Sequence, residues 1–235
     1  MPGIVLYEIG IADGRSASPF VWRTKLSLAR KGLAYRSEML GLTDIPKLFD
    51  GRFATAPIID FGDRQMNESL AIAERLDEAY RDRPAIFAGP TERSMIGFFD
   101  HWLVQLIVTH VLPIYMLDAH DCSAPKERGY YRQSREAFFG RTLEALVADR
   151  EACLPDLRRA LEPVRKAIED RPFLGGQTPN FADMCLIGLF IFVGTIATLP
   201  PLAAGDPLLD YARRALSAFG PETAELSLNL SAKPL

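Results

Sequence analysis

Cysteine is scarce in this sequence: its 235 residues include only Cys122, Cys153 and Cys185. The three lie far apart, form no C-x-x-C pair, and have no histidine pattern with metal-ligand spacing beside them. This argues against a disulfide framework and against a zinc site, and no metal is predicted. We expect the three cysteines to be reduced thiols that are buried or have no chemical role.

The sequence also lacks an excess of positive charge. Its 27 lysines and arginines are outnumbered by 30 aspartates and glutamates, giving a net charge of -3 and a pI near 5.7. This balance offers no electrostatic basis for binding nucleic acid or an anionic membrane surface. We therefore expect a small-molecule substrate. The apolar content of 48% is sufficient for a core in one large or two small domains.

No secretory signal or membrane span is recognisable. The first residues lead directly into the short apolar run Ile4 to Tyr7, without a charged region and a long apolar core. The apolar run from Met184 to Leu199 is shorter than the ~20 residues that a span needs, and glycine and threonine interrupt it. We predict a helix buried in a soluble core, and a cytoplasmic protein.

The first third of the chain predicts a small sheet domain. A strand at 4–9, a helix that begins near Ser18 and a strand at 35–40 form a βαβ unit with parallel strands. A hairpin of 56–60 and 64–67 follows, and then a helix that starts at 67–69. This order is that of a thioredoxin-like domain, which we place at 1–82.

The rest of the chain predicts only helices. A charged, proline- and glycine-rich linker at 83–90 precedes an all-helical domain at 91–220. Its first helix is bent or ended by Pro113. One or two further helices are expected over 128–154 and 155–169, and another at 206–219. Residues 221–235 have no periodicity and are predicted to form a loosely held tail. The predicted fold class is thus α/β plus all-α.

Two helix starts stand out. Ser18 is a good N-cap and Pro19 suits the first helical position. Asn180 with Asp183 forms a capping box before the apolar run, to which we assign a structural role. The helix after Ser18 is predicted to end at Gly32. Its apolar face would consist of Trp22, Leu26, Ala29 and Leu33. Its basic face would consist of Arg23, Lys25, Arg30 and Lys31.

The start at Ser18 suggests a thiolate site. Free N–H groups and a partial positive charge there would stabilise an anion beside the hydroxyls of Ser16 and Ser18. Thioredoxin-like proteins that exchange disulfides carry a cysteine pair at this position, whereas this chain has serines, so the sulfur must arrive on a ligand. A hydroxyl that donates to the sulfur would lower its pKa. The obvious cellular thiol is glutathione.

The same domain offers further contacts for a peptide such as glutathione. A cis bond at Pro57 would expose the backbone of Ala56 for strand-like pairing, although a trans edge-strand proline is equally compatible. Glu68 could bind an α-ammonium group and Ser69 an α-carboxylate, or both could serve only the helix start.

Basic residues in the intervening loop, Lys47 and Arg52, are candidates for a second carboxylate of the ligand, although surface basic residues often have no such role. The second substrate would occupy an apolar pocket between the domains. Candidates for lining it are His101, Trp102, Tyr115 and Met116, for each of which core packing is the alternative.

Together these residues make the chain similar to the glutathione transferase family. Ser18-Pro19-Phe20 followed by Arg23 resembles its serine-type classes, in which the serine stabilises the glutathione thiolate. The resemblance further implies a cis-proline at Ala56-Pro57, a γ-glutamyl site at Glu68-Ser69, the capping box, glutathione as co-substrate, and a homodimer.

The resemblance narrows to the bacterial β-aryl-etherases, which use glutathione to cleave aryl ethers of lignin-derived compounds. It rests on residues 18–25, 87–91, 117–121, 173–177 and 180–183. Ala56 is smaller than usual, and a long C-terminal extension of some etherases is missing. The Ser-Ser-Cys pattern of the zeta class is also missing, which argues against maleylacetoacetate isomerisation. The leading hypothesis is a glutathione transferase acting on a hydrophobic aromatic electrophile; the alternative is a non-catalytic glutathione-binding or regulatory protein.

Overall fold

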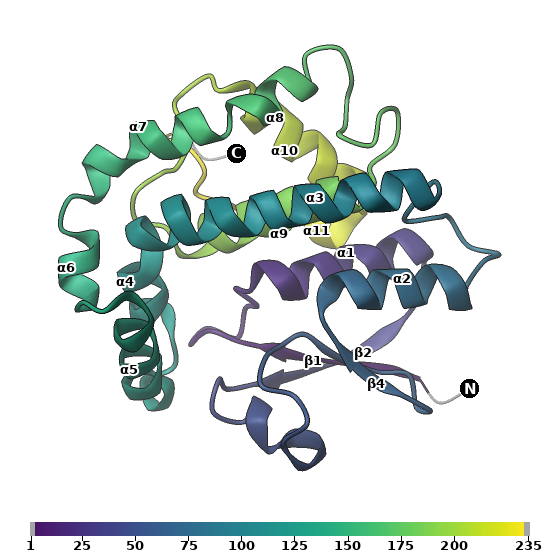
Figure 1. Cartoon of the computed structure of the whole chain (residues 1–235), viewed down its shortest axis with the longest axis horizontal. Coiled ribbons are helices and arrows are strands. Elements are labelled where there is room, and N and C mark those ends of the chain that lie inside the picture. The colour runs from purple at the N-terminus through teal and green to yellow at the C-terminus, as the bar shows by residue number, and fades with distance from the viewer. Residues whose placement is uncertain (1–2, 233–235) are drawn as a thin grey trace.

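A four-stranded sheet forms the base of the molecule in the computed structural model, which describes residues 3–232 (Figure 1). Its strands are β1 (Ile4–Ile9), β2 (Tyr35–Leu40), β3 (Ile58–Asp60) and β4 (Gln65–Asn67), in the order β2-β1-β3-β4. β1 and β2 are parallel, with Ile4 opposite Tyr35. β3 runs antiparallel to both of its neighbours. The predicted βαβ unit and the hairpin are therefore confirmed.

The sheet is covered on both faces. Helices α1 (Pro19–Lys31) and α2 (Ser69–Ala79) lie on the face toward the helical unit (Figure 1). The segment 41–55, which contains the kinked 3₁₀ turn η1 (Ile45–Gly51), covers the other face through a small cluster of Ile45, Phe53 and Ile58. Because β1 and β4 both run antiparallel to β3, they point in the same direction. The helices that follow them, α1 and α2, therefore start at the same end of the sheet.

Helix α1 has the predicted caps but not the predicted faces. Ser18 is its N-cap, and Gly32 ends it in the left-handed conformation (φ 61°). Ala29 is exposed, whereas Arg23 and Lys31 are buried. The prediction of an exposed basic face is thus wrong for these two residues, because α1 is packed between the sheet and the helical unit.

Each of the two buried cations pairs with a half-buried carboxylate. A nitrogen of Arg23 lies 2.5 Å from Asp100 Oδ1, and Lys31 Nζ lies 2.5 Å from Asp77 Oδ1. A buried charge is tolerated when it is paired, and removal of one partner is costly. The Arg23–Asp100 pair therefore joins α1 to the first helix of the second unit.

The helical unit begins with one long bent run. It consists of α3 (Pro90–Leu106), a π turn η2 (Ile107–Val111) and α4 (Leu112–Cys122), and Pro113 lies at the bend as predicted. By length and hydropathy this run would pass as a membrane span. Half of its most apolar window is buried inside the protein, however, which is typical of a core helix.

The helices after this run are shorter than predicted. They are η3 (Pro125–Glu127), α5 (Arg128–Phe139), α6 (Leu143–Val147), α7 (Arg150–Ala160), α8 (Glu162–Ala167), α9 (Phe181–Ile196), α10 (Pro207–Ala218) and α11 (Pro221–Ala224). The predictions of helices over 128–154 and 155–169 are wrong. Gly140 ends α5 in the left-handed conformation, Thr142 caps α6, and Pro155 lies inside α7 rather than before it.

Helix α9 is the buried centre of this unit. All of its 16 residues are buried except Thr195, which is half-buried. The predicted capping box of Asn180 and Asp183 is present. Gly188 lets α9 approach α1 closely, because a Cβ at this position would lie 2.6 Å from the carbonyl oxygen of Pro19. The fold class is confirmed: a thioredoxin-like domain is followed by a helical one, and the limits of the domains stay predictions.

The C-terminal segment is ordered, contrary to the predicted loose tail at 221–235. Leu228 and Leu230 are buried, and Leu230 accepts a hydrogen bond from the amide of Leu202. Asn229 donates from its side chain to the carbonyl of Ala197 at 2.8 Å. Apolar side chains that alternate along an extended segment cover the end of α9. Residues 233–235 of the predicted tail lie outside the described residues.

Candidate functional site

Two adjoining hollows open between the sheet domain and the helices. The polar hollow, of about 430 Å³, lies between the start of α2 and α5. The apolar pocket, of about 340 Å³, lies between the start of α1 and the helical unit. They share five lining residues, which are Ile9, Ser18, Phe20, Leu42 and Arg135. Ser18 therefore lies at the boundary between a polar compartment and an apolar one.

The hydroxyl of Ser18 is only partly used by the protein. Its oxygen accepts a hydrogen bond from the amide of Val21 at 3.4 Å, which caps α1. Over residues 3–232 no acceptor binds its hydroxyl proton. A serine hydroxyl carries one donor and two acceptor sites. Ser18 can thus cap the helix and donate to a ligand at the same time.

Ser16 does not join Ser18, and its predicted place in the site is wrong. Its side chain is buried and donates to the carbonyl of Ile9 at 3.4 Å, while its own carbonyl accepts from Trp22 Nε1 at 3.0 Å. It lines neither hollow. The reason is the bridge between Gly10 and Ser16, which fastens this loop to the end of β1.

The far wall of the polar hollow contains the other predicted contacts. The bond between Ala56 and Pro57 is cis, one of the two alternatives that the sequence left open. Glu68 has φ 68° and ψ 105°, a strained conformation for a non-glycine residue, and its exposed side chain does not cap α2. Ser69, the first residue of α2, is buried beside it. All four residues line the hollow with Ser18.

Lys47 and Arg52 do not line the polar hollow, contrary to their prediction as contacts for a second carboxylate. Lys47 is exposed and pairs with Asp44 at 2.8 Å within η1. Arg52 lies over the ring of Phe53 and reaches Gln65 at 3.5 Å. The kink in η1 directs this loop toward the outer face of the sheet, where Phe53 is part of the core.

Of the predicted second-substrate residues, Met116 alone lines the apolar pocket. Tyr115 is buried in the core, and its hydroxyl donates to the carbonyl of Leu199 at 2.9 Å. His101 is exposed, and Trp102 lines a different surface hollow with residues of α7. The structure therefore does not bring these three residues to the apolar pocket.

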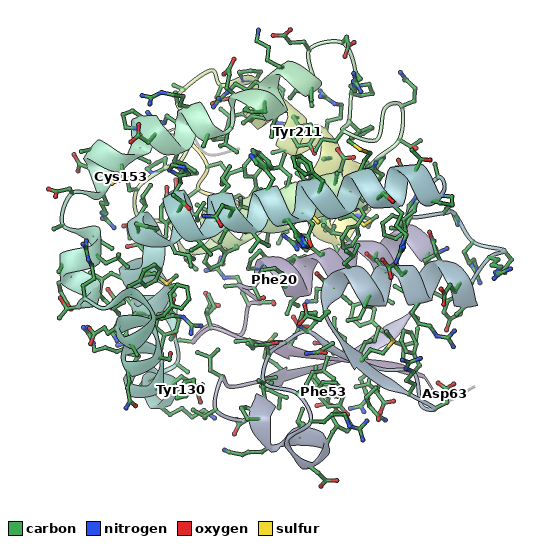
Figure 2. All side chains as sticks on the ribbon, viewed as in Figure 1. Phe20, Phe53, Asp63, Tyr130, Cys153 and Tyr211 are labelled. Atoms are coloured by element: carbon green, nitrogen blue, oxygen red, sulfur yellow. The ribbon has the colours of Figure 1, made fainter. Side chains whose placement is uncertain are left out.

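Several lining residues of the site were not identified from the sequence. Phe20 lies in the first turn of α1, and Tyr130 lies on α5, near the edge of the sheet domain (Figure 2). Tyr131 lines the apolar pocket, and burial raises the pKa of its phenol to about 12. Arg135 reaches both hollows. The available signal was the aromatic-rich run from 130 to 139, which also contains Arg132 and Arg135.

The apolar pocket is built mainly from helical segments of the second unit. Its apolar lining includes Val104, Ile107, Val108, Leu112, Ala119, Phe138, Phe139, Phe192 and Ile196. A pocket lined in this way excludes water and favours an apolar or aromatic molecule. The pocket also contains the acidic residue Glu127, whose carboxylate accepts hydrogen bonds from the amide and the hydroxyl of Thr43, at 3.0 and 3.1 Å.

Within residues 3–232 no cluster of three or more histidines, cysteines, aspartates or glutamates is suited to hold a metal. His120 instead pairs with the adjacent Asp121 at 2.8 Å near the end of α4.

Family models match both parts of the chain. Residues 14–84 match the model described as "Glutathione S-transferase, N-terminal domain", and residues 94–199 match "Glutathione S-transferase, C-terminal domain". The two matches cover the sheet with its helices and most of the helical unit.

Curated relatives agree with these matches. The chain is similar to glutathione S-transferase U7 of Arabidopsis thaliana, with 24% identity over 73% of this chain and 64% of the relative. It thus spans slightly less than two thirds of that protein. A probable glutathione S-transferase of Glycine max is 22% identical over 77% of this chain and 69% of its own.

Solved structures have the same fold. A glutathione S-transferase of Ceriporiopsis subvermispora, crystallised with glutathione, superposes with a TM-score of 0.80 at 23% identity, over 95% of this chain and 98% of the other. A glutathione transferase of Phanerochaete chrysosporium gives a TM-score of 0.77 at 23% identity, over 94% and 98%. At this identity the likeness concerns the fold.

Proposed function

Because the chain belongs to the glutathione S-transferase superfamily, we propose that it is a glutathione transferase that activates the thiol of glutathione with Ser18. The electrophile that the thiolate attacks is proposed to be a small hydrophobic aromatic molecule. The observation that carries this proposal is the position of Ser18, with its unused hydroxyl proton, at the boundary of the polar hollow and the apolar pocket.

Glutathione is proposed to occupy the polar hollow. Its γ-glutamyl group carries an ammonium and a carboxylate, which suit the exposed carboxylate of Glu68 and the hydroxyl and helix start at Ser69. Its cysteinyl backbone suits pairing with Ala56, as an added strand. This orientation would direct its sulfur toward Ser18.

Thiolate stabilisation at Ser18 combines two effects. The hydroxyl donates a hydrogen bond to the sulfur, and the start of α1 contributes a partial positive charge. Both favour the ionised thiol and lower its pKa. The electrophile in the apolar pocket is then held against a nucleophile of fixed position, which lowers the entropic part of the barrier.

A more specific proposal for the reaction is the cleavage of β-aryl ethers. Its support is the apolar, aromatic-rich lining of the pocket beside Ser18, together with the sequence motifs that resemble bacterial β-aryl-etherases. In such a reaction the sulfur would displace an aryl oxide from carbon. General conjugation of aromatic electrophiles requires the same site and differs only in the leaving group.

An assay of glutathione consumption tests the function. The wild-type protein, S18A and S16A would be incubated with glutathione and a panel of aryl ethers, aryl halides and epoxides. We expect consumption with at least one class, lost in S18A and retained in S16A. Retention of the protein on immobilised glutathione without consumption in any class would instead favour a non-catalytic glutathione-binding protein.

A homodimer is proposed as the assembly. On α3, the side chains of Met95 and Phe98 are 64% and 71% exposed, which is unusual for large apolar residues and supports an interface there. Sedimentation of the wild-type protein and of M95K would test this. A monomer in the wild type would contradict the proposal.

A further inference from the structure

Arg135 is a cationic side chain that lines both hollows. It is half-buried on α5, the helix that faces the sheet domain across the site (Figure 1). Its guanidinium lies 5.0 Å from the centre of the Tyr131 ring and 3.3 Å from the hydroxyl of Ser134. These contacts hold the guanidinium in place without neutralising its charge.

Arg135 has no carboxylate partner in the part of the chain that the structure describes, unlike three arginines that form ion pairs in the interior. Arg23, Arg150 and Arg165 pair with Asp100, Asp118 and Asp206, at 2.5, 2.9 and 2.6 Å. Within residues 3–232, no acidic side chain lies within 4.0 Å of Arg135.

The carboxylates nearest to Arg135 in the chain and in the pocket are already bound. Glu136 accepts from Arg132 at 2.9 Å and from the amide of Leu143 at 3.1 Å. Glu127, which also lines the apolar pocket, accepts from Thr43. A half-buried guanidinium without an internal counterion favours an anion from a ligand.

We infer that Arg135 stabilises the negative charge on an oxygen that leaves the electrophile, and that the preferred substrates are aryl ethers with poor leaving groups. The inference rests on the proposed function. The glutathione thiolate donates an electron pair to carbon and forms the S–C bond. The C–O bond breaks, the aryl oxide keeps its electron pair, and it later takes a proton from water.

The location of Arg135 suits this role. The leaving oxygen must lie on the side of the carbon opposite the sulfur, and the sulfur is proposed to lie at Ser18. Arg135 lines the same boundary from the opposite element, α5, whereas Ser18 lines it from α1. An apolar surrounding strengthens the attraction between a guanidinium and an oxyanion. The phenol of Tyr131, which also lines the pocket, already donates a hydrogen bond to Met116 Sδ at 3.3 Å.

Two measurements test the inference, with R135Q as the variant and R132Q as its matched control. Arg132 lies one turn earlier on α5 and pairs with Glu144 and Glu136 outside both hollows. The first measurement is the pKa of bound para-nitrophenol, from its visible absorbance. We expect this pKa to be lower on the wild type and on R132Q than on R135Q.

The second measurement uses the para-nitrophenyl, phenyl and para-methoxyphenyl ethers of one common carbon group. For R135Q we expect kcat to fall by about 10- to 100-fold with the poorest leaving group, which is the effect of losing one hydrogen bond to a charged group. The fall should be smaller with the para-nitrophenyl ether, and the KM for glutathione should be unchanged.

The outcomes separate the inference from the proposed function. Equal pKa values of bound nitrophenol on wild type and R135Q would overturn the inference. A raised KM for glutathione with an unchanged dependence on the leaving group would also overturn it, because Arg135 would then bind glutathione. A lowered nitrophenol pKa on wild type and R132Q without any glutathione consumption would support the anion site and contradict the transferase proposal.

Discussion

The starts of α1 and α9 carry similar capping signals but serve different purposes. At α9, Asn180 caps the amides of Ala182 and Asp183, and Asp183 accepts four hydrogen bonds. At α1, Ser18 caps Val21 alone, and its hydroxyl proton meets no acceptor among residues 3–232.

The difference between the two starts lies in what surrounds them. The α9 start is enclosed by the backbone of 174–175 and by Tyr211, so all of its polar groups bind inside the protein. The α1 start faces the polar hollow and the apolar pocket. A capped helix start therefore stabilises the fold when it is closed, and it offers a ligand site when it is open.

Removal of Asp183 should have the largest effect on stability. Its carboxylate accepts from the amides of Leu174, Gly175 and Asn180 at 2.8 to 2.9 Å, and from Tyr211 Oη at 2.7 Å. We expect D183A to lower the free energy of unfolding by about 3 to 5 kcal/mol, because buried donors lose their charged partner. Urea unfolding measures this change.

Asp210 provides a control for that variant. It lies on α10, is exposed, and pairs with Arg213 at the surface. D210A should change the free energy of unfolding by less than about 1 kcal/mol. Similar losses in D183A and D210A would contradict the distinction between the closed α9 start and the surface.

Removal of the Ser18 hydroxyl should instead affect activity. We expect S18A to lower the rate of glutathione transfer by about 10²- to 10³-fold, the effect of losing one donor to a developing or stored anion. The free energy of unfolding should fall by only about 1 kcal/mol, the cost of a lost N-cap. S16A, whose hydroxyl binds Ile9 outside both hollows, should keep its activity. A larger loss in S16A than in S18A would contradict this assignment.

The contact between the start of α1 and the middle of α9 can be broken at Gly188. A Cβ there would lie 2.6 Å from the Pro19 carbonyl, next to Ser18. We expect G188A to lower the free energy of unfolding by about 1 to 3 kcal/mol, because the backbone must move. Activity should fall as well, since the displaced segment carries Ser18, but by less than in S18A.

Gly194 provides the matched control on the same helix. A Cβ there would lie 2.7 Å from Leu228 Cβ, at the other end of α9. G194A should lose comparable stability and retain its turnover at a temperature where it is folded. If both glycine variants lost activity equally, the link between Gly188 and Ser18 would be refuted.

The smallest effect concerns pH. Burial raises the pKa of Asp183, and its hydrogen bonds to Asn180, Tyr211 and the 174–175 backbone oppose that shift. The folded state then binds the proton more tightly than the unfolded state, so the contribution of Asp183 to stability falls as pH rises above its ordinary value of 3.8.

Unfolding of the wild type and D183N across that pH window measures the effect. The advantage of the wild type over D183N should shrink as pH rises, by at most about 1.4 kcal/mol per pH unit. An advantage that grows with pH in this window would show that the carboxylate is favoured in the folded state.

Local signals in the sequence predicted the helix starts and the sheet. Caps such as Ser18, Gly32 and Asn180 act within one turn, so their residue types are informative without the rest of the chain. The order of strands and helices also brought Pro57 and the 68–69 pair toward Ser18, since short connections leave few topologies.

Features that depend on distant partners were not predictable in this way. Amphipathic spacing assigns Arg23 and Lys31 to solvent, but carboxylates in other elements allow their burial. Arg135 lines the same hollows as Ser18 only because α5 packs beside the sheet domain. The ordered C-terminal segment did carry a signal, the alternating leucines of 226–230, which predicts an extended and half-buried strand-like run.

The pKa of the thiol of bound glutathione tests the central claim most directly. It can be measured from the ultraviolet absorbance of the thiolate as pH is varied, in wild type, S18A and S16A. We predict a pKa well below the ordinary thiol value of about 8.5 in wild type and S16A, and a return toward that value in S18A. An identical, lowered pKa in S18A would show that Ser18 does not stabilise the thiolate.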